Sequence, residues 1–180
     1  LFPCLNIYRQ SQSGRGFEYF GEDPYLTGQM VAGYVRRMLQ SGTMPVLKHF
    51  LANNTDHHRR RSDSVVDERT LHEIYMPGFE AGIAAGAPAV MTSYNLVNGE
   101  WAGQSDYVIT QLLRKDLGFT GLVMTDWRAV WDTEKVIKSG LDLEMPLGET
   151  VRPQVMRLLE EGKVTPQDID RMARSVLRTC

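Results

Sequence analysis

Short apolar runs alternate along the sequence with longer segments of helical periodicity, and this alternation restricts the fold more than any other feature. Runs of about four to eight apolar residues bounded by turn residues are typical of buried strands. Five such runs occur, at Leu1–Tyr8, Pro45–Leu51, Ala89–Tyr94, Thr120–Thr125 and Leu141–Met145. A helix in each gap is the pattern of βαβ crossovers, so the sequence predicts an α/β fold with a parallel sheet. An open doubly wound sheet and part of a (β/α)8 barrel both satisfy it.

Capping residues mark the predicted helices in the gaps. Asp23 and Pro24 form a typical helix start, and Ser41-Gly42 is a typical stop. Pro77 predicts a kink in the second helix, because proline lacks the N–H that an intact helix needs. The predicted helices are 24–42, 67–86, 106–118 with Asp106 as its cap, 129–139, 151–161 and 165–177, and the polar stretches 53–65 and 95–105 are predicted loops.

The bulk composition disfavours several classes of function. The chain has 180 residues, of which 42% are hydrophobic, with a net charge of −2 and a pI near 6.1. These values give no electrostatic basis for binding nucleic acid or a membrane surface, and no apolar stretch reaches the ~18 residues of a spanning helix. The sequence contains neither G-x-G-x-x-G after a predicted strand nor G-x-x-x-x-G-K-[ST], the two glycine-rich phosphate-binding motifs. Their absence disfavours a nucleotide site. We expect a soluble protein with a neutral or small polar partner.

Metal and disulfide chemistry are also disfavoured. Cys4 and Cys180 have neither metal-type spacing nor the density of a disulfide scaffold. His49 ends a predicted strand, whereas the adjacent His57 and His58 cannot readily bind one ion from a regular element. We therefore expect no metal and no cofactor. The chain begins without an initiator Met and stops inside a predicted helix, so we expect a fragment.

Polar residues at the carboxyl ends of parallel strands are expected to converge on one edge of the sheet. In this sequence they are Lys48, His49, Met91, Tyr94, Asp126, Trp127, Asp142 and Glu144. The apolar run 120–125 stops at Asp126, which Trp127 follows at once. We expect Asp126 to carry the reaction, and its alternative is a strand-end Asp that caps a turn. Trp127 has two interpretations as well, a face for a ligand or core packing.

A carboxylate grouped with Lys, His, Arg, Tyr and Trp suits a neutral ligand rich in hydroxyl groups, such as a sugar. Charged groups bind hydroxyls strongly, and a flat aromatic face covers a sugar ring. Cleavage of a glycosidic bond with retention requires a carboxylate nucleophile and a second carboxylic acid about 5–5.5 Å away. Glu18, Asp56, Glu100 and Glu144 are candidates for that acid by residue type, and none of them is favoured. One arginine of 59–61 is expected to enter the site.

Six stretches, in order along nearly the whole chain, form a pattern of their own. They are 14–24 (Gly-Arg-Gly-Phe-Glu-Tyr-Phe-Gly-Glu-Asp-Pro), 48–54, 66–71, 90–95, 124–127 (Met-Thr-Asp-Trp) and 140–146. Together they closely resemble the family-3 glycoside hydrolases of β-glucosidase type. The resemblance implies that Asp126 is the catalytic nucleophile and that Trp127 lines the sugar subsite.

Further site residues follow from the same resemblance. It implies that the non-reducing glucose is bound, or the nucleophile held, by Arg15, Lys48, His49, Arg59, Met91 and Tyr94. Arg59 is placed by counting through a loop, and a shift of one residue would substitute Arg60. Tyr94 is an expected hydrogen-bond partner of Asp126. A related branch, the N-acetylglucosaminidases, recruits a loop His as acid/base, but Leu51-Ala52 stands where that branch has Pro-Gly, so His57 and His58 are not expected to act in that way.

The resemblance also implies a domain organisation. The five runs would be the fourth to eighth strands of a (β/α)8-type barrel. The first three strands, and an α/β sandwich domain that in this family carries the general acid/base Glu, would then be absent from residues 1–180. The missing parts of the same polypeptide, or a homo-oligomer, would complete the fold, because an incomplete barrel leaves open edges.

The expected activity is that of a retaining β-glucosidase acting on terminal non-reducing β-D-glucosyl residues. A β-xylosidase or related exo-glycosidase of the same family is the near alternative. A catalytically silent fragment that lacks its general acid/base is the alternative from another class.

Overall fold

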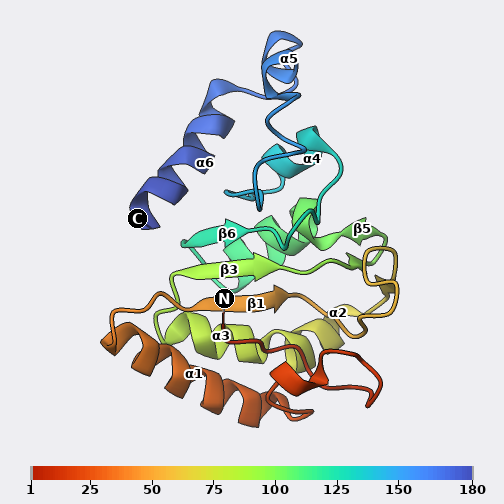
Figure 1. Cartoon of the computed structure of the whole chain (residues 1–180), viewed down its shortest axis with the longest axis vertical. Helices are drawn as coiled ribbons and strands as arrows, with labels where there is room; N and C mark the ends of the chain where they lie inside the picture. Colours follow the sequence, from red (N-terminus) through yellow and green to blue (C-terminus); the bar gives the residue numbers. More distant parts are fainter. Residues whose placement is uncertain (1, 180) are drawn as a thin grey trace.

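The computed structural model describes residues 2–179, and a parallel three-stranded sheet lies at its centre (Figure 1). Leu1 of the first predicted run and Cys180 lie outside the described residues. The strands are β1 (Val46–Phe50), β3 (Ala89–Thr92) and β6 (Leu122–Met124), in the order β1-β3-β6. They follow one another in chain order, as in a (β/α)8 barrel, whereas a doubly wound sheet reverses its strand order.

The two outermost apolar runs extend this sheet through isolated bridges instead of full strands. Cys4 bridges Lys48 in parallel on one edge, and Leu143 bridges Met124 in parallel on the other. Pro3 contributes to the shortness of the first run, because proline has no N–H to donate to a neighbouring strand. The prediction of five parallel runs, arranged as part of a (β/α)8-type barrel, is therefore confirmed in order and direction, with outer members shorter than predicted.

Helices fill the gaps between the runs, as predicted. The α-helices are α1 (Pro24–Gln40), α2 (Glu68–Thr70), α3 (Pro77–Ala84), α4 (Thr133–Lys138), α5 (Val155–Glu160) and α6 (Pro166–Thr179); η2 (Leu71–Tyr75) and η4 (Tyr107–Asp116) are π-helical, and η1 (Gly16–Glu18) and η3 (Ala102–Gln104) are 3-10 turns. The helices α4 and α5 begin later than predicted. Within residues 2–179, no helix is both long and apolar enough to span a membrane.

The helix ends test the capping predictions. Asp23 caps α1 as predicted, and its carboxylate accepts a backbone N–H of the first turn at 2.9 Å. The predicted irregularity at Pro77 is confirmed, because the π-helical η2 ends at Tyr75, Met76 forms a bend, and α3 begins at Pro77. The predicted cap at Asp106 is wrong. The Ser105 hydroxyl accepts the Val108 N–H at 3.2 Å instead, and the Asp106 side chain makes no capping bond.

A second, smaller sheet lies in stretches that the sequence predicts as loops. Its strands are β2 (Asp63–Ser64), β4 (Leu96–Val97) and β5 (Glu100–Trp101), in the order β2-β4-β5. The loop prediction is wrong at these residues, because strands of two residues are too short to show a periodicity. The Trp101 indole donates to the Arg60 carbonyl at 3.0 Å, so this sheet holds the loop 53–62 beside the carboxyl ends of β1 and β3 (Figure 1).

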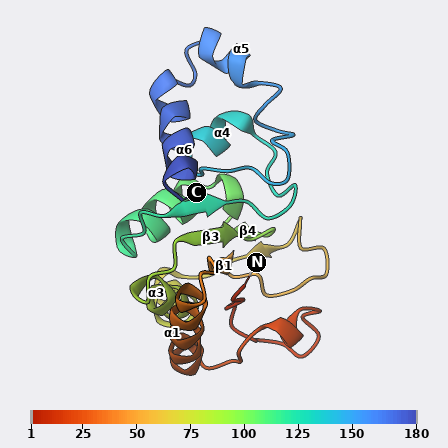
Figure 2. The same ribbon diagram turned by 60° about the vertical axis from the view of Figure 1, so that its left-hand side comes forward.

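The two faces of the central sheet pack differently. On the outer face Leu47, Val90 and Val123 join the main core with residues of α1, α3 and η4 (Figure 2). On the inner face a smaller apolar cluster, the inner cluster, consists of Val46, Ala89, Met91, Leu122 and Met124, with Val176 of α6 packed against it. Successive residues of β3 thus alternate between the faces with the period of a strand. An inner face with its own apolar layer is what the interior of a barrel requires.

Candidate active site

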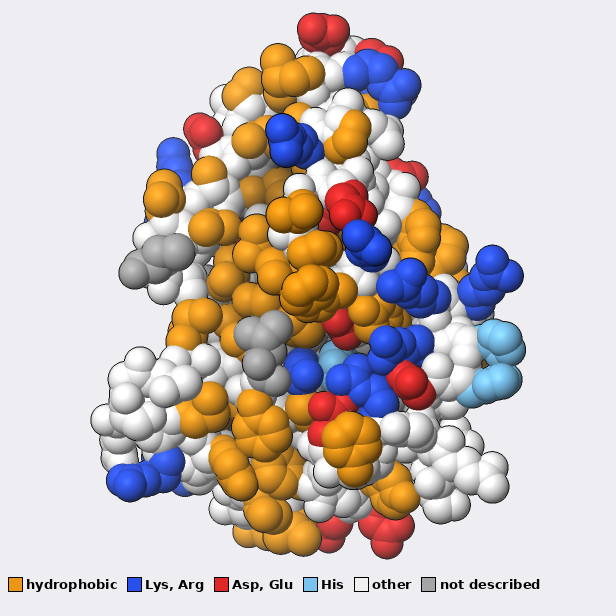
Figure 3. Space-filling model, in the orientation of Figure 1, with side chains coloured by type: hydrophobic (Ala, Val, Ile, Leu, Met, Phe, Trp, Pro, Cys, Tyr) orange, Lys and Arg blue, Asp and Glu red, His pale blue; other side chains and the backbone are white. Residues whose placement is uncertain are grey.

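Polar and charged side chains gather at the carboxyl ends of β1, β3 and β6, beside the hydrophobic middle of the face shown in Figure 3. Asp126 is separated from the end of β6 by one residue, Thr125. It is buried, with 6% of its surface exposed. The preceding residue is bound twice to the neighbouring run: Thr125 N–H donates to the Leu143 carbonyl at 3.0 Å, and the Thr125 hydroxyl accepts from Met145 N–H at 2.8 Å. The position of the Asp126 carboxylate is therefore fixed by its backbone.

The two oxygens of Asp126 have different surroundings. Oδ1 accepts the Trp127 backbone N–H at 2.7 Å, whereas Oδ2 has no hydrogen-bond partner among residues 2–179. Burial raises the pKa of Asp126 above its ordinary value, and the Trp127 N–H, Arg15, Arg59 and Lys48 act in the opposite direction. One oxygen is thus anchored, and the other is left to react. This arrangement disfavours the interpretation of Asp126 as a turn-capping residue, because the only bond it makes is to its own neighbour.

His49 lies against the unpaired oxygen. Its Nε2 is 3.4 Å from Asp126 Oδ2, and its side chain is buried. Burial lowers the pKa of His49 well below its ordinary value, and the charges of Arg15, Lys48 and Arg59 lower it further. The imidazole is therefore neutral at physiological pH. The contact with Asp126 joins a neutral ring to a carboxylate and is not an ion pair.

Arg15, directly before η1, and Lys48, on β1, both lie near Asp126. Both act on the pKa of Asp126 through their charge. Both are also bound to Glu18: Arg15 forms an ion pair with it, and Lys48 Nζ lies 3.8 Å from Glu18 Oε2. The structure thus brings these two predicted site residues together with Asp126.

Arg59 and Arg60 both face Tyr94. The guanidinium of Arg59 lies 4.2 Å from the centre of the Tyr94 ring and that of Arg60 lies 5.2 Å from it. Arg59 also binds Asp56 at 2.6 Å and contributes its charge at Asp126. Sequence reasoning left Arg60 as the substitute for Arg59, whereas the structure has both arginines beside the same ring.

Tyr94 is buried near Asp126 without being bonded to it. Burial, and then the charge of Asp126, raise the pKa of Tyr94. Its hydroxyl interacts with Arg60, and no hydrogen bond joins it to Asp126 in the described part of the chain. The expected hydrogen bond between Tyr94 and Asp126 is therefore absent from the structure.

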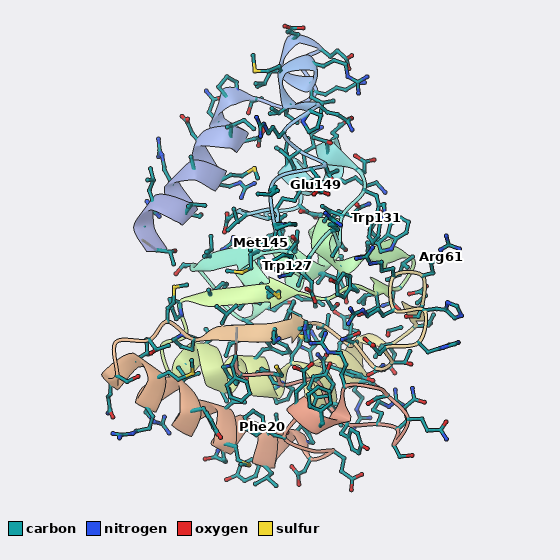
Figure 4. The ribbon with its side chains drawn as sticks, viewed as in Figure 1. Phe20, Arg61, Trp127, Trp131, Met145 and Glu149 are labelled. Carbon is teal, nitrogen blue, oxygen red and sulfur yellow. The ribbon has the colours of Figure 1, made fainter. Side chains whose placement is uncertain are left out.

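Met91 and Trp127 differ in burial. Met91 is 2% exposed and belongs to the inner cluster, so it forms part of the floor below the strand ends. Trp127 is 53% exposed at the end of β6 (Figure 4). This exposure excludes the core-packing interpretation of Trp127 and leaves its ring available to a ligand.

Asp142, another carboxylate at a strand end, stabilises the fold. Asp142 accepts from Arg114 at 2.7 Å, Arg171 at 3.0 Å and Val123 N–H at 2.9 Å. Its partners Arg114 and Arg171 lie on the helices η4 and α6, so the prediction that Asp142 joins the site is wrong. It lies one residue from Leu143 of the inner face, and the alternation of a strand turns it outward.

The candidate acids named from the sequence are also engaged. Glu144 is buried and accepts the backbone N–H groups of Thr150 at 2.7 Å and Val151 at 2.8 Å. Glu100 binds Lys135 and accepts from Gln104 at 2.9 Å. Asp56 is paired with Arg59, and Glu18 with Arg15 and Lys48. Each of the four carboxylates thus has a partner that fixes it in place.

Gln104 is a supporting residue that the sequence did not reveal. It is 3% exposed, and its Oε1 accepts from the N–H groups of Trp131 at 2.9 Å and Asp132 at 3.1 Å. These bonds fix the segment that follows Trp127 (Figure 4). A buried Gln inside a stretch expected to be a polar loop has no distinguishing signal in the sequence.

The other histidines lie apart from the site. The rings of His57 and His58 contact each other in an exposed loop, with centroids 4.0 Å apart. Among residues 2–179, no group of three His, Cys, Asp or Glu side chains is spaced to hold a metal ion.

Known proteins are similar to this chain in both sequence and fold. The chain is 41% identical to the probable beta-glucosidase K of Emericella nidulans, over 98% of this chain and 21% of that protein. It is 40% identical to an exo-alpha-(1->6)-L-arabinopyranosidase of Bifidobacterium breve, over 98% of this chain and 23% of that protein. Its fold matches beta-glucosidase 3B of Thermotoga neapolitana in complex with glucose with a TM-score of 0.94 at 36% identity, covering 99% of this chain and 26% of that one.

The chain therefore spans between 21% and 26% of the length of these relatives. Residues 1–179 match the family described as the glycosyl hydrolase family 3 N-terminal domain. The match includes Met124-Thr-Asp-Trp127 and the strand ends around it, so both the ordered motifs and the fold lead to one assignment. This chain belongs to glycosyl hydrolase family 3.

Proposed function

We propose that this chain is the nucleophile-bearing part of a retaining β-glucosidase, with Asp126 as the nucleophile. The observation that carries the proposal is the unpaired Oδ2 of Asp126, which is buried beside a neutral His49 and next to an exposed Trp127. Support comes from the family assignment and from relatives that are named beta-glucosidases.

The proposed reaction has two steps. Asp126 Oδ2 attacks the anomeric carbon of a β-glucoside, and the bond from that carbon to the aglycone oxygen breaks while a general acid protonates that oxygen. Water then attacks the same carbon, the bond to Oδ2 breaks, and the general base takes the proton of the water. Glucose leaves with the β configuration, because the two inversions cancel.

The cations around Asp126 suit the binding of sugar hydroxyls. Arg15, Lys48 and Arg59 donate charge-assisted hydrogen bonds, which are stronger than neutral ones. The neutral His49 accepts a hydrogen bond from a sugar hydroxyl, or donates one to it, without adding charge. In the proposed complex the exposed ring of Trp127 covers the apolar face of the sugar, and Met91 lines the floor.

We propose that the general acid comes from outside residues 1–180. Glu18, Asp56, Glu100 and Glu144 each form an ion pair or a hydrogen bond with another group, whereas Asp126 Oδ2 has no hydrogen-bond partner among residues 2–179. The chain also spans about a quarter or less of its relatives. The acid, the first three barrel strands and a following α/β sandwich domain would then belong to the same longer polypeptide. A homo-oligomer that supplies the acid is the alternative arrangement.

A second candidate substrate is a pyranoside without the C6 hydroxymethyl group. The observation that favours it is the relative named exo-alpha-(1->6)-L-arabinopyranosidase, which is as similar to this chain as several beta-glucosidases. A β-xyloside belongs to the same class. The ratio of kcat/KM for 4-nitrophenyl β-D-glucoside to that for the β-D-xyloside and α-L-arabinopyranoside decides between them.

The reaction itself is tested by following the anomeric configuration of the first-formed sugar by proton NMR. We expect the complete polypeptide to release β-glucose from an aryl β-glucoside before mutarotation. Initial release of α-glucose would contradict the retaining mechanism. We expect a verified chain of 180 residues to be inactive, and turnover by it would place the acid among its own carboxylates.

A further inference from the structure

Glu18 lies at the meeting point of three groups around the strand ends. Its Oε1 pairs with Arg15, the residue before η1, and Lys48 Nζ of β1 lies 3.8 Å from its Oε2. The Cys4 thiol, from the first run, donates to the same Oε2 at 3.2 Å. One carboxylate therefore joins a residue of its own segment to two residues, Cys4 and Lys48, that are distant in sequence.

All of these groups are shielded from water. The side chains of Arg15, Lys48 and Glu18 are between 14% and 18% exposed, and Cys4 is 1% exposed. Ion pairs at exposed surfaces contribute little, whereas shielded ones hold their partners more firmly and are strongly disrupted when one partner is removed. Burial raises the pKa of Cys4 to about 12, so the thiol stays protonated and remains a hydrogen-bond donor to Glu18.

The two cations that Glu18 holds are the ones that act on the nucleophile. Arg15 and Lys48 both carry charge that is felt at Asp126 and at His49. Neither forms an ion pair with another acidic side chain among residues 2–179. A long arginine or lysine side chain that loses its only acidic partner regains rotamer freedom, so it no longer occupies one defined position.

We propose that Glu18 is a positioning residue of the active site, which acts by clamping Arg15 and Lys48 in the geometry that binds the sugar hydroxyls. This inference rests on the proposed function. It also assigns a role to a carboxylate that, by residue type alone, is a candidate acid: with its two oxygens engaged by a guanidinium, an ammonium and a thiol, Glu18 serves the site without touching the reacting atoms.

The test uses the complete polypeptide and the substitution Glu18→Gln, which removes the charge and keeps the shape. We expect kcat/KM for 4-nitrophenyl β-D-glucoside to fall by roughly 10- to 100-fold, mainly through a higher KM, because mispositioned binding groups lose ground-state contacts as well. Rates are divided by the number of active sites, titrated with a 2-deoxy-2-fluoro glucoside, so that unfolded protein does not contribute. Glu22→Gln is the matched control on an exposed residue of the same segment, and we expect wild-type kinetics from it.

A double substitution separates positioning from general support of the fold. If Glu18 acts through Lys48, then Glu18→Gln added to Lys48→Met lowers kcat/KM by less than Glu18→Gln alone. Fully additive effects, or wild-type KM for Glu18→Gln, would overturn the inference. If Glu18→Gln does not fold, Glu18→Asp keeps the charge and shortens the reach, and we expect a smaller rise in KM. Failure of both variants to fold would assign Glu18 to the fold alone.

The two proposals fail in different ways. A wild-type polypeptide that does not hydrolyse the β-glucoside would overturn the proposed function. An active wild type with unchanged kinetics in Glu18→Gln would overturn the role of Glu18 and leave the proposed function intact.

Discussion

The Nε2 atom of His49 lies 3.4 Å from Oδ2 of Asp126, and both side chains are buried at the carboxyl ends of β1 and β6, the two strands that flank β3. Burial acts on the two groups in opposite directions, because it raises the pKa of the carboxyl and lowers that of the imidazole. Because the imidazole is neutral, the positive charges that favour the ionised form of Asp126 are those of Arg15, Arg59 and Lys48. This pairing determines how the site responds to pH.

The acidic limb of the pH profile follows from Asp126. The nucleophile must be ionised to attack, and its pKa lies above the ordinary value of 3.8. We expect kcat/KM to fall, as pH decreases, at a pH above 3.8. His49 stays neutral well below 6.5, so no limb from its protonation is expected near that pH. Measuring kcat/KM between pH 3 and pH 8 checks this, and an acidic limb at or below 3.8 would contradict it.

Replacing the nucleophile is expected to stabilise the fold. Because the pKa of Asp126 is higher in the folded than in the unfolded state, the folded state binds its proton more tightly. Stability is then lost as pH rises through the folded pKa, and a penalty remains at neutral pH. We expect Asp126→Asn to have a higher Tm than the wild type at pH 7, with a difference that shrinks below the unfolded pKa. Thermal unfolding at several pH values measures it, and a lower Tm at pH 7 would contradict the sign.

Arg59 and Arg60 are expected to differ in function although both face Tyr94. Arg59 contributes its charge at Asp126, whereas Arg60 donates to the Trp127 carbonyl at 3.4 Å and contacts Tyr94. We expect Arg59→Ala to lower kcat/KM by roughly 10- to 150-fold and Arg60→Ala to lower it less, since losing a hydrogen bond from a charged group costs about 1.5–3 kcal/mol. Steady-state kinetics of both variants compare them. The reverse order would shift the assignment by one residue.

Asp142 is expected to stabilise the fold without serving catalysis. Its side chain is completely buried and bound by Arg114 and Arg171. We expect Asp142→Ala to destabilise the fold by about 3–5 kcal/mol, because two cations lose a buried partner. Glu134→Gln, which breaks an exposed pair with Lys138, is the control and should cost less than about 1 kcal/mol. Denaturant unfolding measures both, and equal effects would contradict this role of Asp142.

The sheet and the strand ends were predictable from sequence because they depend on periodicity. Buried runs such as 89–94 and 120–125 show their strand character in composition alone, and a polar residue directly after such a run, like Asp126, is placed at the strand end by chain connectivity. The start of α1 at Pro24 was predictable for a similar reason, because its cap is the adjacent residue Asp23.

The parts that sequence did not predict depend on contacts between distant segments. The strands β2, β4 and β5 are too short for any periodicity. Asp142 and Glu144 lie two residues apart in the same predicted run, and the sequence does not show that Arg114 of η4 and Arg171 of α6 bind Asp142. Ser105 and Asp106 are both good caps by residue type, so their backbone positions decide between them. The interaction of Tyr94 with Arg60 depends on how the loop 53–62 folds.

The central claim is that Asp126 forms the glycosyl-enzyme intermediate. The most direct test treats the complete polypeptide with a 2-deoxy-2-fluoro β-glucoside bearing a good leaving group, followed by proteolysis and mass spectrometry of the labelled peptide. We predict one equivalent of label, attached to Asp126 in the peptide that contains Met124-Thr-Asp-Trp127 and absent from Asp126→Asn. A stable label on any other residue of an active enzyme would contradict it.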